Sequence, residues 1–143
     1  MQESKHADAI KETMRTIDEA LKGKNILDFQ RRLASMLSVG LQHLVELYLH
    51  RLYVIKPGAF VKHEWFLMGD KNLKAKFSAI LTQPYEEIEN INEIASLARD
   101  IEGDRNELLY GSPIGDENRL KEKIGSFLEI KKIVEKTGDI IES

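Results

Sequence analysis

The apolar residues of this chain recur at the spacing of an α-helix along most of its length. Within residues 3–22, four of them are separated by four, three and four positions: Ile10, Met14, Ile17 and Leu21. That spacing places apolar side chains along one face of a helix with about 3.6 residues per turn. No segment shows the alternation of apolar and polar residues that is typical of a half-buried strand. The periodicity therefore predicts an all-α fold.

Five segments carry this pattern, and they are joined by short connections: 3–22, 28–54, 63–81, 84–110 and 117–135. The second has the widest apolar face and is expected to be the central helix. In the third, the stretch MGDKN predicts a bend or a short break. Pro84 is expected in the first turn of the fourth helix, with Asp28 and Asp116 capping the second and the fifth. Short connections make neighbouring helices antiparallel, so we predict an antiparallel up-and-down bundle of four to five helices.

A chain of 143 residues is long enough to form one domain with a substantial core. We predict a single domain over residues 1–143, with its core at about residues 3–135 and a frayed tail past Gly138. The chain contains no cysteine, which excludes disulfides, zinc–thiolate sites and cysteine nucleophiles.

The polar N-terminal stretch lacks the apolar region of a signal peptide. The apolar-looking span 33–55 is not expected to cross a membrane, because polar and charged residues interrupt it: Gln42, His43, Glu46, His50 and Arg51. Together with the absence of thiols, these features lead us to expect a cytoplasmic protein. The net charge of -3 excludes a broad basic surface for nucleic acid, so contact with RNA would be local.

Two charged residues interrupt the apolar stripe of the fourth predicted helix. The stripe and its continuation at the same spacing are Ile88, Ile91, Ala95, Ala98, Glu102, Arg105 and Leu109. Glu102 and Arg105 are three positions apart and can pair on a helix surface, although burying such a pair adds little stability. Two interpretations follow. Either the stripe simply ends in solvated charge, where an arginine suits the helix dipole, or these residues form a functional site.

The stretch RNELLYG, on a late helix of a small antiparallel bundle, resembles the HEPN family (higher eukaryotes and prokaryotes nucleotide-binding domain). Members of that family carry an arginine, usually followed by a polar residue such as asparagine, and a histidine several positions later. Arg105 and Asn106 match the first two positions. Tyr110 stands where the histidine would be, and no histidine follows His63. Outside this stretch the similarity is a pattern of helices over about residues 28–134.

The resemblance implies a homodimer that contacts RNA or a nucleotide in a cleft between two copies. Where the motif is catalytic, it implies an endoribonuclease that needs no metal, and it also implies a nucleotidyltransferase partner, in some members within a toxin–antitoxin pair. Arg105 would bind phosphate through its planar guanidinium, and Asn106 would contact phosphate or ribose. Tyr110 would donate a hydrogen bond or stack on a base. Glu102 and Arg99 complete the candidate site as binding residues.

The alternative is a non-catalytic interaction module that docks a protein partner on the same surface. Phe60, Trp65 and Phe66 are predicted to fill the core, but part of the stretch AFVKHEWF can instead form a partner surface, because Trp and Phe are enriched at interfaces. The fifth helix is fairly basic, and its interleaved glutamates indicate a solvated face. The lysines of that face are Lys121, Lys123, Lys131 and Lys132.

Three potential metal ligands share one face of the second predicted helix: His43, Glu46 and His50. Two histidines and a carboxylate can bind a divalent metal. Histidines on a half-buried helix also serve as hydrogen-bonded structural groups, and only His63 and Glu64 suggest themselves as further ligands. We therefore predict no metal and no cofactor, with the metal-bound alternative left open.

Overall fold

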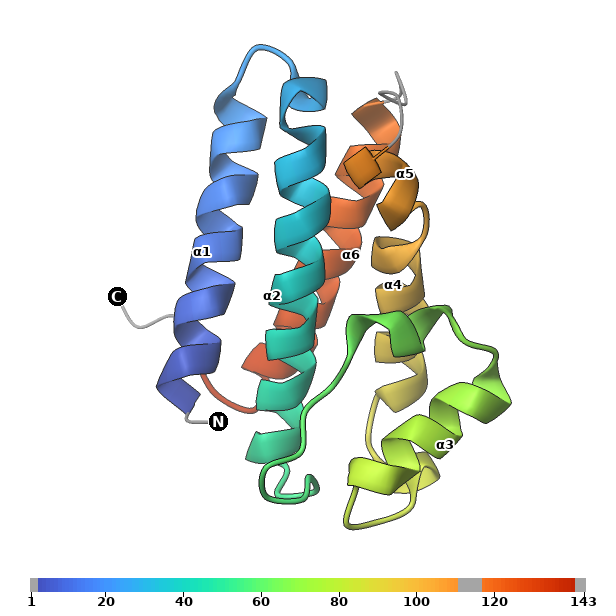
Figure 1. Cartoon of the computed structure of the whole chain (residues 1–143). Coiled ribbons are helices and arrows are strands. Elements are labelled where there is room, and N and C mark those ends of the chain that lie inside the picture. Colours follow the sequence, from blue (N-terminus) through green and yellow to red (C-terminus); the bar gives the residue numbers. More distant parts are fainter. Residues whose placement is uncertain (1–2, 111–116, 141–143) are drawn as a thin grey trace.

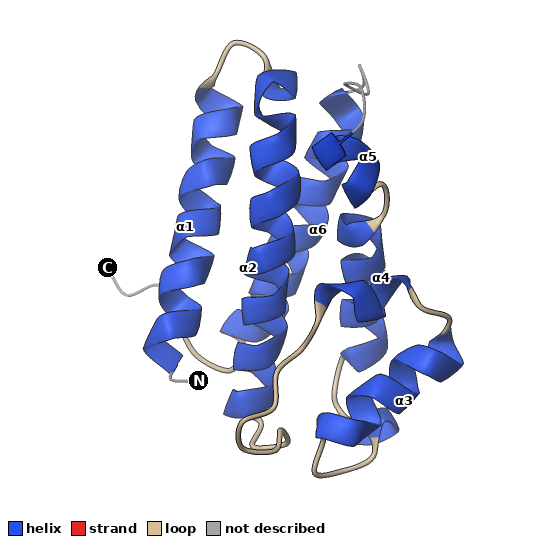
Figure 2. Ribbon diagram, in the orientation of Figure 1, coloured by secondary structure: helices blue, strands red, loops and turns tan. Residues whose placement is uncertain are grey.

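A computed structural model describes residues 3–110 and 117–140, and these residues form helices and connections without a named strand. The α-helices are α1 (Glu3–Lys22), α2 (Gln30–Arg51), α3 (Asp70–Ile80), α4 (Ile91–Glu102), α5 (Arg105–Tyr110) and α6 (Glu117–Glu135). Three short 3-10 helices lie between them: η1 (Ile26–Phe29), η2 (His63–Leu67) and η3 (Tyr85–Glu87). The long helices α1, α2, α4 and α6 run alternately up and down (Figure 1), and all regular structure is helical (Figure 2). The predicted all-α bundle is confirmed.

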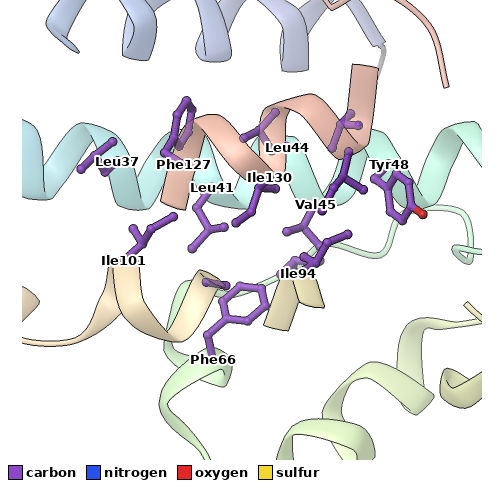
Figure 3. Packing of buried hydrophobic residues seen from close by; sticks show 14 of the residues in the cluster. Leu37, Leu41, Leu44, Val45, Tyr48, Phe66, Ile94, Ile101, Phe127 and Ile130 are labelled. Carbon is purple, nitrogen blue, oxygen red and sulfur yellow. The ribbon is translucent and has the colours of Figure 1, made fainter. Parts of the chain in front are cut away.

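Helix α2 is the centre of the bundle, as its wide apolar face predicted, and it contacts α1, α4, α5 and α6. Figure 3 shows its side chains interleaved with those of α4, α6 and η2; the labelled residues are Leu37, Leu41, Leu44, Val45, Tyr48, Phe66, Ile94, Ile101, Phe127 and Ile130. Each such large apolar side chain contributes about 1.5–3 kcal/mol on full burial. Despite this apolar character, no helix within the described ranges is long and apolar enough to cross a membrane.

Gly40 allows three helices to meet closely in the middle of the bundle. A Cβ atom at this position of α2 would lie 2.5 Å from Oγ1 of Thr13 on α1 and 2.9 Å from Cε1 of Phe127 on α6. Thr13 is itself held in place, because its hydroxyl donates to the carbonyl of Ala9 at 3.0 Å. The absence of a side chain at Gly40 therefore sets how near α1 and α6 approach α2.

Helix α3 lies outside the four long helices and packs through aromatic side chains. Phe77 meets Trp65 edge-on with ring centroids 5.4 Å apart, and it lies 5.8 Å from both Phe66 and Tyr85. The bend predicted from MGDKN is confirmed, since η2 ends at Leu67 and α3 begins only at Asp70. Trp65 and Phe66 are buried as predicted, whereas Phe60 is exposed.

The prediction of one continuous helix over residues 84–110 is wrong. Pro84 precedes the short η3, and α4 begins only at Ile91, after Asn90 adopts a left-handed φ of 63°. A second break separates α4 from α5 at Gly103 and Asp104, where Asp104 also has a φ of 63°. Left-handed residues interrupt a right-handed helix, and Asn and Asp tolerate this conformation better than most side chains.

The predicted N-caps also change. Asp28 lies within η1, and the capping side chain is Asn25, whose Oδ1 accepts from the amide of Leu27 at 3.1 Å. Asp116 lies outside the described residues. The chain departs from prediction here because the approach to α2 tightens into a 3-10 turn, which moves the start of α2 to Gln30.

Arg51 joins the start of α1 and the stretch after α6 to the end of α2. Its guanidinium pairs with Glu3 at 2.6 Å and donates to the carbonyls of Gly138 and Asp139 at 2.6 and 2.9 Å. Ile140 is buried. The expectation of a frayed tail past Gly138 is therefore wrong for the two residues that follow it.

Candidate functional site

The break between α4 and α5 creates the candidate site. Helix α4 closes with the amide of Gly103 bonded to the carbonyl of Arg99 at 2.9 Å, and α5 opens with the amide of Leu108 bonded to the carbonyl of Asp104 at 2.9 Å. The left-handed Asp104 turns the chain between these two bonds. The periodicity placed Glu102 and Arg105 on one straight helix, but Glu102 ends α4 and Arg105 begins α5. The chain around these two residues faces η2.

Lys123 of α6 holds the end of α4 in place. Its buried ammonium donates to the carbonyls of Asp100 at 2.7 Å and Ile101 at 3.2 Å, and also to that of Gly103. The last carbonyls of a helix lack hydrogen-bond donors within that helix. Lys123 supplies a donor to the carbonyls that the break leaves without one. Burial lowers the pKa of Lys123, with the neighbouring Arg119 acting in the same direction. The prediction of a solvated lysine is wrong for Lys123.

Further contacts fix the break from the surface and from α2. Arg119 pairs with Asp100 and with Asp104, each at 3.1 Å. On the other side, the side-chain Nε2 of Gln30 donates to the carbonyl of Leu108 at 3.2 Å. Helices α5, α6 and α2 are thereby joined around the turn, which makes the turn a rigid support for the side chains on either side of it.

Glu102 is a buried carboxylate whose two oxygens are both engaged. It is 1% exposed; Oε1 accepts from the hydroxyl of Ser38 at 2.7 Å, and Oε2 lies 3.1 Å from Nδ1 of His63. The backbone amide of His63 is held in turn by Oε1 of Gln42 at 2.7 Å. When Nδ1 donates to Glu102, the neutral imidazole keeps Nε2 as an acceptor. In that tautomer, the carboxylate of Glu102 fixes the orientation of the His63 ring.

Arg105 lies beside this pair. It is half-buried, and its Nε is buried without a hydrogen-bond partner among the residues that the structure describes. No ion pair joins it to Glu102 within that same set, so the surface pairing that their spacing suggested does not form. A cleft of about 520 Å³ opens at this place, lined by His63, Glu64, Leu67, Glu102, Asp104, Arg105, Asn106 and Glu107.

The structure brings three of the five predicted site residues together. Glu102, Arg105 and Asn106 line this cleft. Tyr110 is 80% exposed and is not among the lining residues. Arg99 lines a separate cleft of about 410 Å³, where its guanidinium donates to two backbone carbonyls at the end of η2.

Sequence reasoning missed His63 as a member of this site. It is separated from Glu102 by 39 positions, so no local spacing connects the two residues. The only available signal was that His63 is the last histidine of a chain in which the expected motif histidine is replaced. Its placement depends on η2 packing against α4, a contact that helical periodicity does not encode.

The charge of the cleft is mixed. Glu64 and Glu107 are exposed carboxylates, whereas Asp104 is paired with Arg119 at 3.1 Å. The guanidinium of Arg105 and the imidazole of His63 therefore share the cleft with exposed carboxylates. Such a cleft suits a single phosphate or another small anion in contact with Arg105 more than a long run of phosphates.

Comparisons of this chain with family models, with curated proteins and with solved structures find no match.

Proposed function

We propose that this chain is a HEPN-like, RNA-contacting domain that cleaves a phosphodiester in the cleft at the α4–α5 break. The observation that carries the proposal is the contact between the buried Glu102 and His63, whose Oε2 and Nδ1 atoms are 3.1 Å apart. This pair lines the same cleft as Arg105. In this proposal His63 transfers the proton, in place of the family's histidine, whose position is occupied here by Tyr110. Imidazole is the side chain best suited to transfer protons near neutral pH.

The proposed reaction needs no metal. Nε2 of His63 takes the proton from a ribose 2′-hydroxyl, and the 2′-oxygen attacks the adjacent phosphorus. Arg105 stabilises the negative charge that develops on the phosphate oxygens, and Asn106 holds a phosphate oxygen or a ribose hydroxyl. The leaving 5′-oxygen then takes up the proton that His63 accepted. The products are a 2′,3′-cyclic phosphate and a 5′-hydroxyl end.

Glu102 acts in this proposal as a positioning residue. Its carboxylate holds Nδ1 of His63 and stabilises the positively charged imidazolium that forms during proton transfer. The hydroxyl of Ser38, at 2.7 Å, fixes the carboxylate.

We further propose that the active form is a homodimer in which two clefts face one another. The family resemblance also implies a nucleotidyltransferase as a partner protein.

Cleavage of a mixed-sequence single-stranded RNA in the presence of a chelator tests the proposal. The chain should cleave this RNA, and should leave DNA of the same sequence intact because it lacks the 2′-hydroxyl. Arg105→Ala and His63→Gln should each lower the rate at least about 100-fold. Arg15→Ala, which removes an exposed arginine on α1, is the matched control and should retain the rate. Light scattering of the same samples should give a dimer mass.

Cleavage that persists in both Arg105→Ala and His63→Gln would contradict the proposal, as would cleavage that requires a metal. The alternative is a non-catalytic module that docks a protein, and one feature favours it: Leu67, on the rim of the cleft, is 55% exposed. That alternative predicts neither cleavage nor nucleotide binding by folded protein.

A further inference from the structure

A cluster of histidines lies between α1 and α2, on residues that the proposed ribonuclease does not use. His43, Glu46 and His50 share one face of α2, as their spacing predicted, and His6 of α1 packs against them. The ring centroid of His6 is 5.2 Å from that of His43 and 5.5 Å from that of His50. His63 and Glu64, the further ligands considered from sequence, line the other cleft instead.

Three of these side chains present ligand atoms to one point. Nδ1 of His6 lies 3.0 Å from Nδ1 of His43 and 3.7 Å from Oε2 of Glu46, and each of the three residues offers one ligand atom within 4.8 Å of those of the other two. Metal–ligand bonds of about 2.0–2.2 Å place the ligand atoms of a tetrahedral zinc site roughly 3.3 Å apart. The observed separations lie on either side of that value.

Glu46 is held in the orientation that a ligand needs. Its side chain is only 5% exposed, and Oε1 accepts from the backbone amide of Val61 at 2.6 Å. This bond leaves Oε2 facing His6. A hydrogen bond to the non-ligating atom is the usual way in which proteins orient a metal ligand.

Two imidazole nitrogens of this cluster lack a hydrogen-bond partner within the described part of the chain. His6 is fully buried, yet its Nε2 has no hydrogen-bond partner among the described residues, and the same is true of the buried Nε2 of His50. Buried polar atoms in native proteins nearly always have partners. A polar network that served only to join α1 to α2 would be expected to satisfy its imidazoles. A metal ion held through Nδ1 of His6 leaves the Nε2 of that ring as a donor, so only the Nε2 of His50 bears on the metal site, as a candidate further ligand.

The electrostatics of the cluster suit a cation. Neutral imidazole is the form that binds metals. The Glu46 carboxylate is only 5% exposed, and a bound cation offsets the cost of burying such a group.

We propose that His6, His43 and Glu46 bind a divalent transition-metal ion that joins α1 to α2. Neutral imidazole and carboxylate ligands suit zinc and its neighbours in the first transition row. Three protein ligands leave a coordination position for water or for His50. The site involves different residues and a different pair of helices from the α4–α5 cleft, so it stands or falls independently of the proposed cleavage.

Zinc binding to the chain without an affinity tag, after treatment with a chelator, tests the proposal. Calorimetric titration should give one Zn²⁺ per chain, and Zn²⁺ should raise the melting temperature, because a ligand that binds only the folded state stabilises it. His43→Gln, at a half-buried position, should weaken binding at least about 100-fold, since loss of an outer-shell contact alone often costs 10–100-fold. His63→Gln is the matched control and should bind Zn²⁺ as the parent does.

Cobalt gives a readout that needs no variant. Co²⁺ added to the parent chain should show the intense visible absorption of a low-symmetry, four- or five-coordinate site. A spectrum identical to that of the aqueous ion would overturn the proposal even if His43→Gln failed to fold. Equal Zn²⁺ affinity of the parent and a folded His43→Gln would overturn it as well, because binding would then be adventitious.

Discussion

Lys123 and Glu102 are ionisable side chains buried beside the α4–α5 break. Each has its own hydrogen-bond partners: backbone carbonyls for Lys123, and Ser38 and His63 for Glu102. Burying a charge is tolerable only with such partners. At the scale of the residue, the candidate site therefore depends on Lys123, although Lys123 does not line the cleft. Its hydrogen bonds fix the end of the helix that carries Glu102.

Replacing Lys123 with methionine should separate the hydrogen bonds of its ammonium from the packing of its stem. Lys123→Met keeps a similar length but leaves the carbonyls of Asp100, Ile101 and Gly103 without that donor. We expect the free energy of unfolding, measured by urea denaturation, to fall by about 3 kcal/mol. Lys132→Met, at an exposed position of the same helix, should change it by less than about 0.5 kcal/mol. An unchanged or more stable Lys123→Met would show that desolvation of the ammonium outweighs its hydrogen bonds.

Two glycines occupy the interiors of long helices in contrasting surroundings. Gly40 of α2 has α1 and α6 pressed against it, whereas a Cβ atom at Gly125 of α6 would have no neighbour within 4 Å. Glycine is a poor helix former, by about 1 kcal/mol relative to alanine. At the scale of the element, Gly40 is required by the packing of three helices, and Gly125 has no such requirement.

The same substitution should therefore have opposite effects at the two positions. Gly125→Ala should raise the free energy of unfolding by about 0.5–1 kcal/mol through helix propensity. Gly40→Ala should lower it by about 1–3 kcal/mol, because the added methyl overlaps Thr13 and the buried ring of Phe127. Thermal or urea denaturation of both variants measures the difference. Stabilisation by Gly40→Ala would show that α1 and α6 can move apart at little cost.

At the scale of the whole molecule, the ionisation of buried tyrosines can follow unfolding in two parts of the fold. Two of the four tyrosines are buried, one in each part. Tyr48 lies in the bundle and donates to the carbonyl of Glu89 at 2.6 Å, while Tyr85 packs on Phe77 beneath α3. Burial raises the pKa of both phenols above 10. Tyr53 and Tyr110 are exposed.

We expect folding stability to fall as pH rises above about 10. The unfolded chain loses its phenolic protons there, whereas the folded chain retains those of Tyr48 and Tyr85 until a higher pH. Each retained proton costs up to about 1.4 kcal/mol of stability per pH unit. Ultraviolet titration should show two phenolate populations, with the later one abolished in the double variant Tyr48→Phe/Tyr85→Phe. A single transition for both buried phenols would support the predicted single domain, whereas separate transitions would divide α3 from the bundle.

The sequence alone determined the all-α fold class and the order of the long helices along the chain. Residues 3–22 and 117–135 were bounded correctly, and α2 was identified as the central helix, because helical periodicity is a local property that an apolar face records directly. Local composition also predicted the break at MGDKN, between η2 and α3. Arg105 and Asn106 were selected through the family resemblance, and both line the cleft at the α4–α5 break.

Tertiary structure decided which residues meet. The division of the fourth segment at Asn90 and Asp104, the burial of Lys123 and the placement of His63 on Glu102 all depend on contacts between segments far apart in sequence. His6 joined His43 and Glu46 for the same reason. Periodicity states which face of a helix is apolar, but the partner of a buried polar group is fixed only when the helices pack.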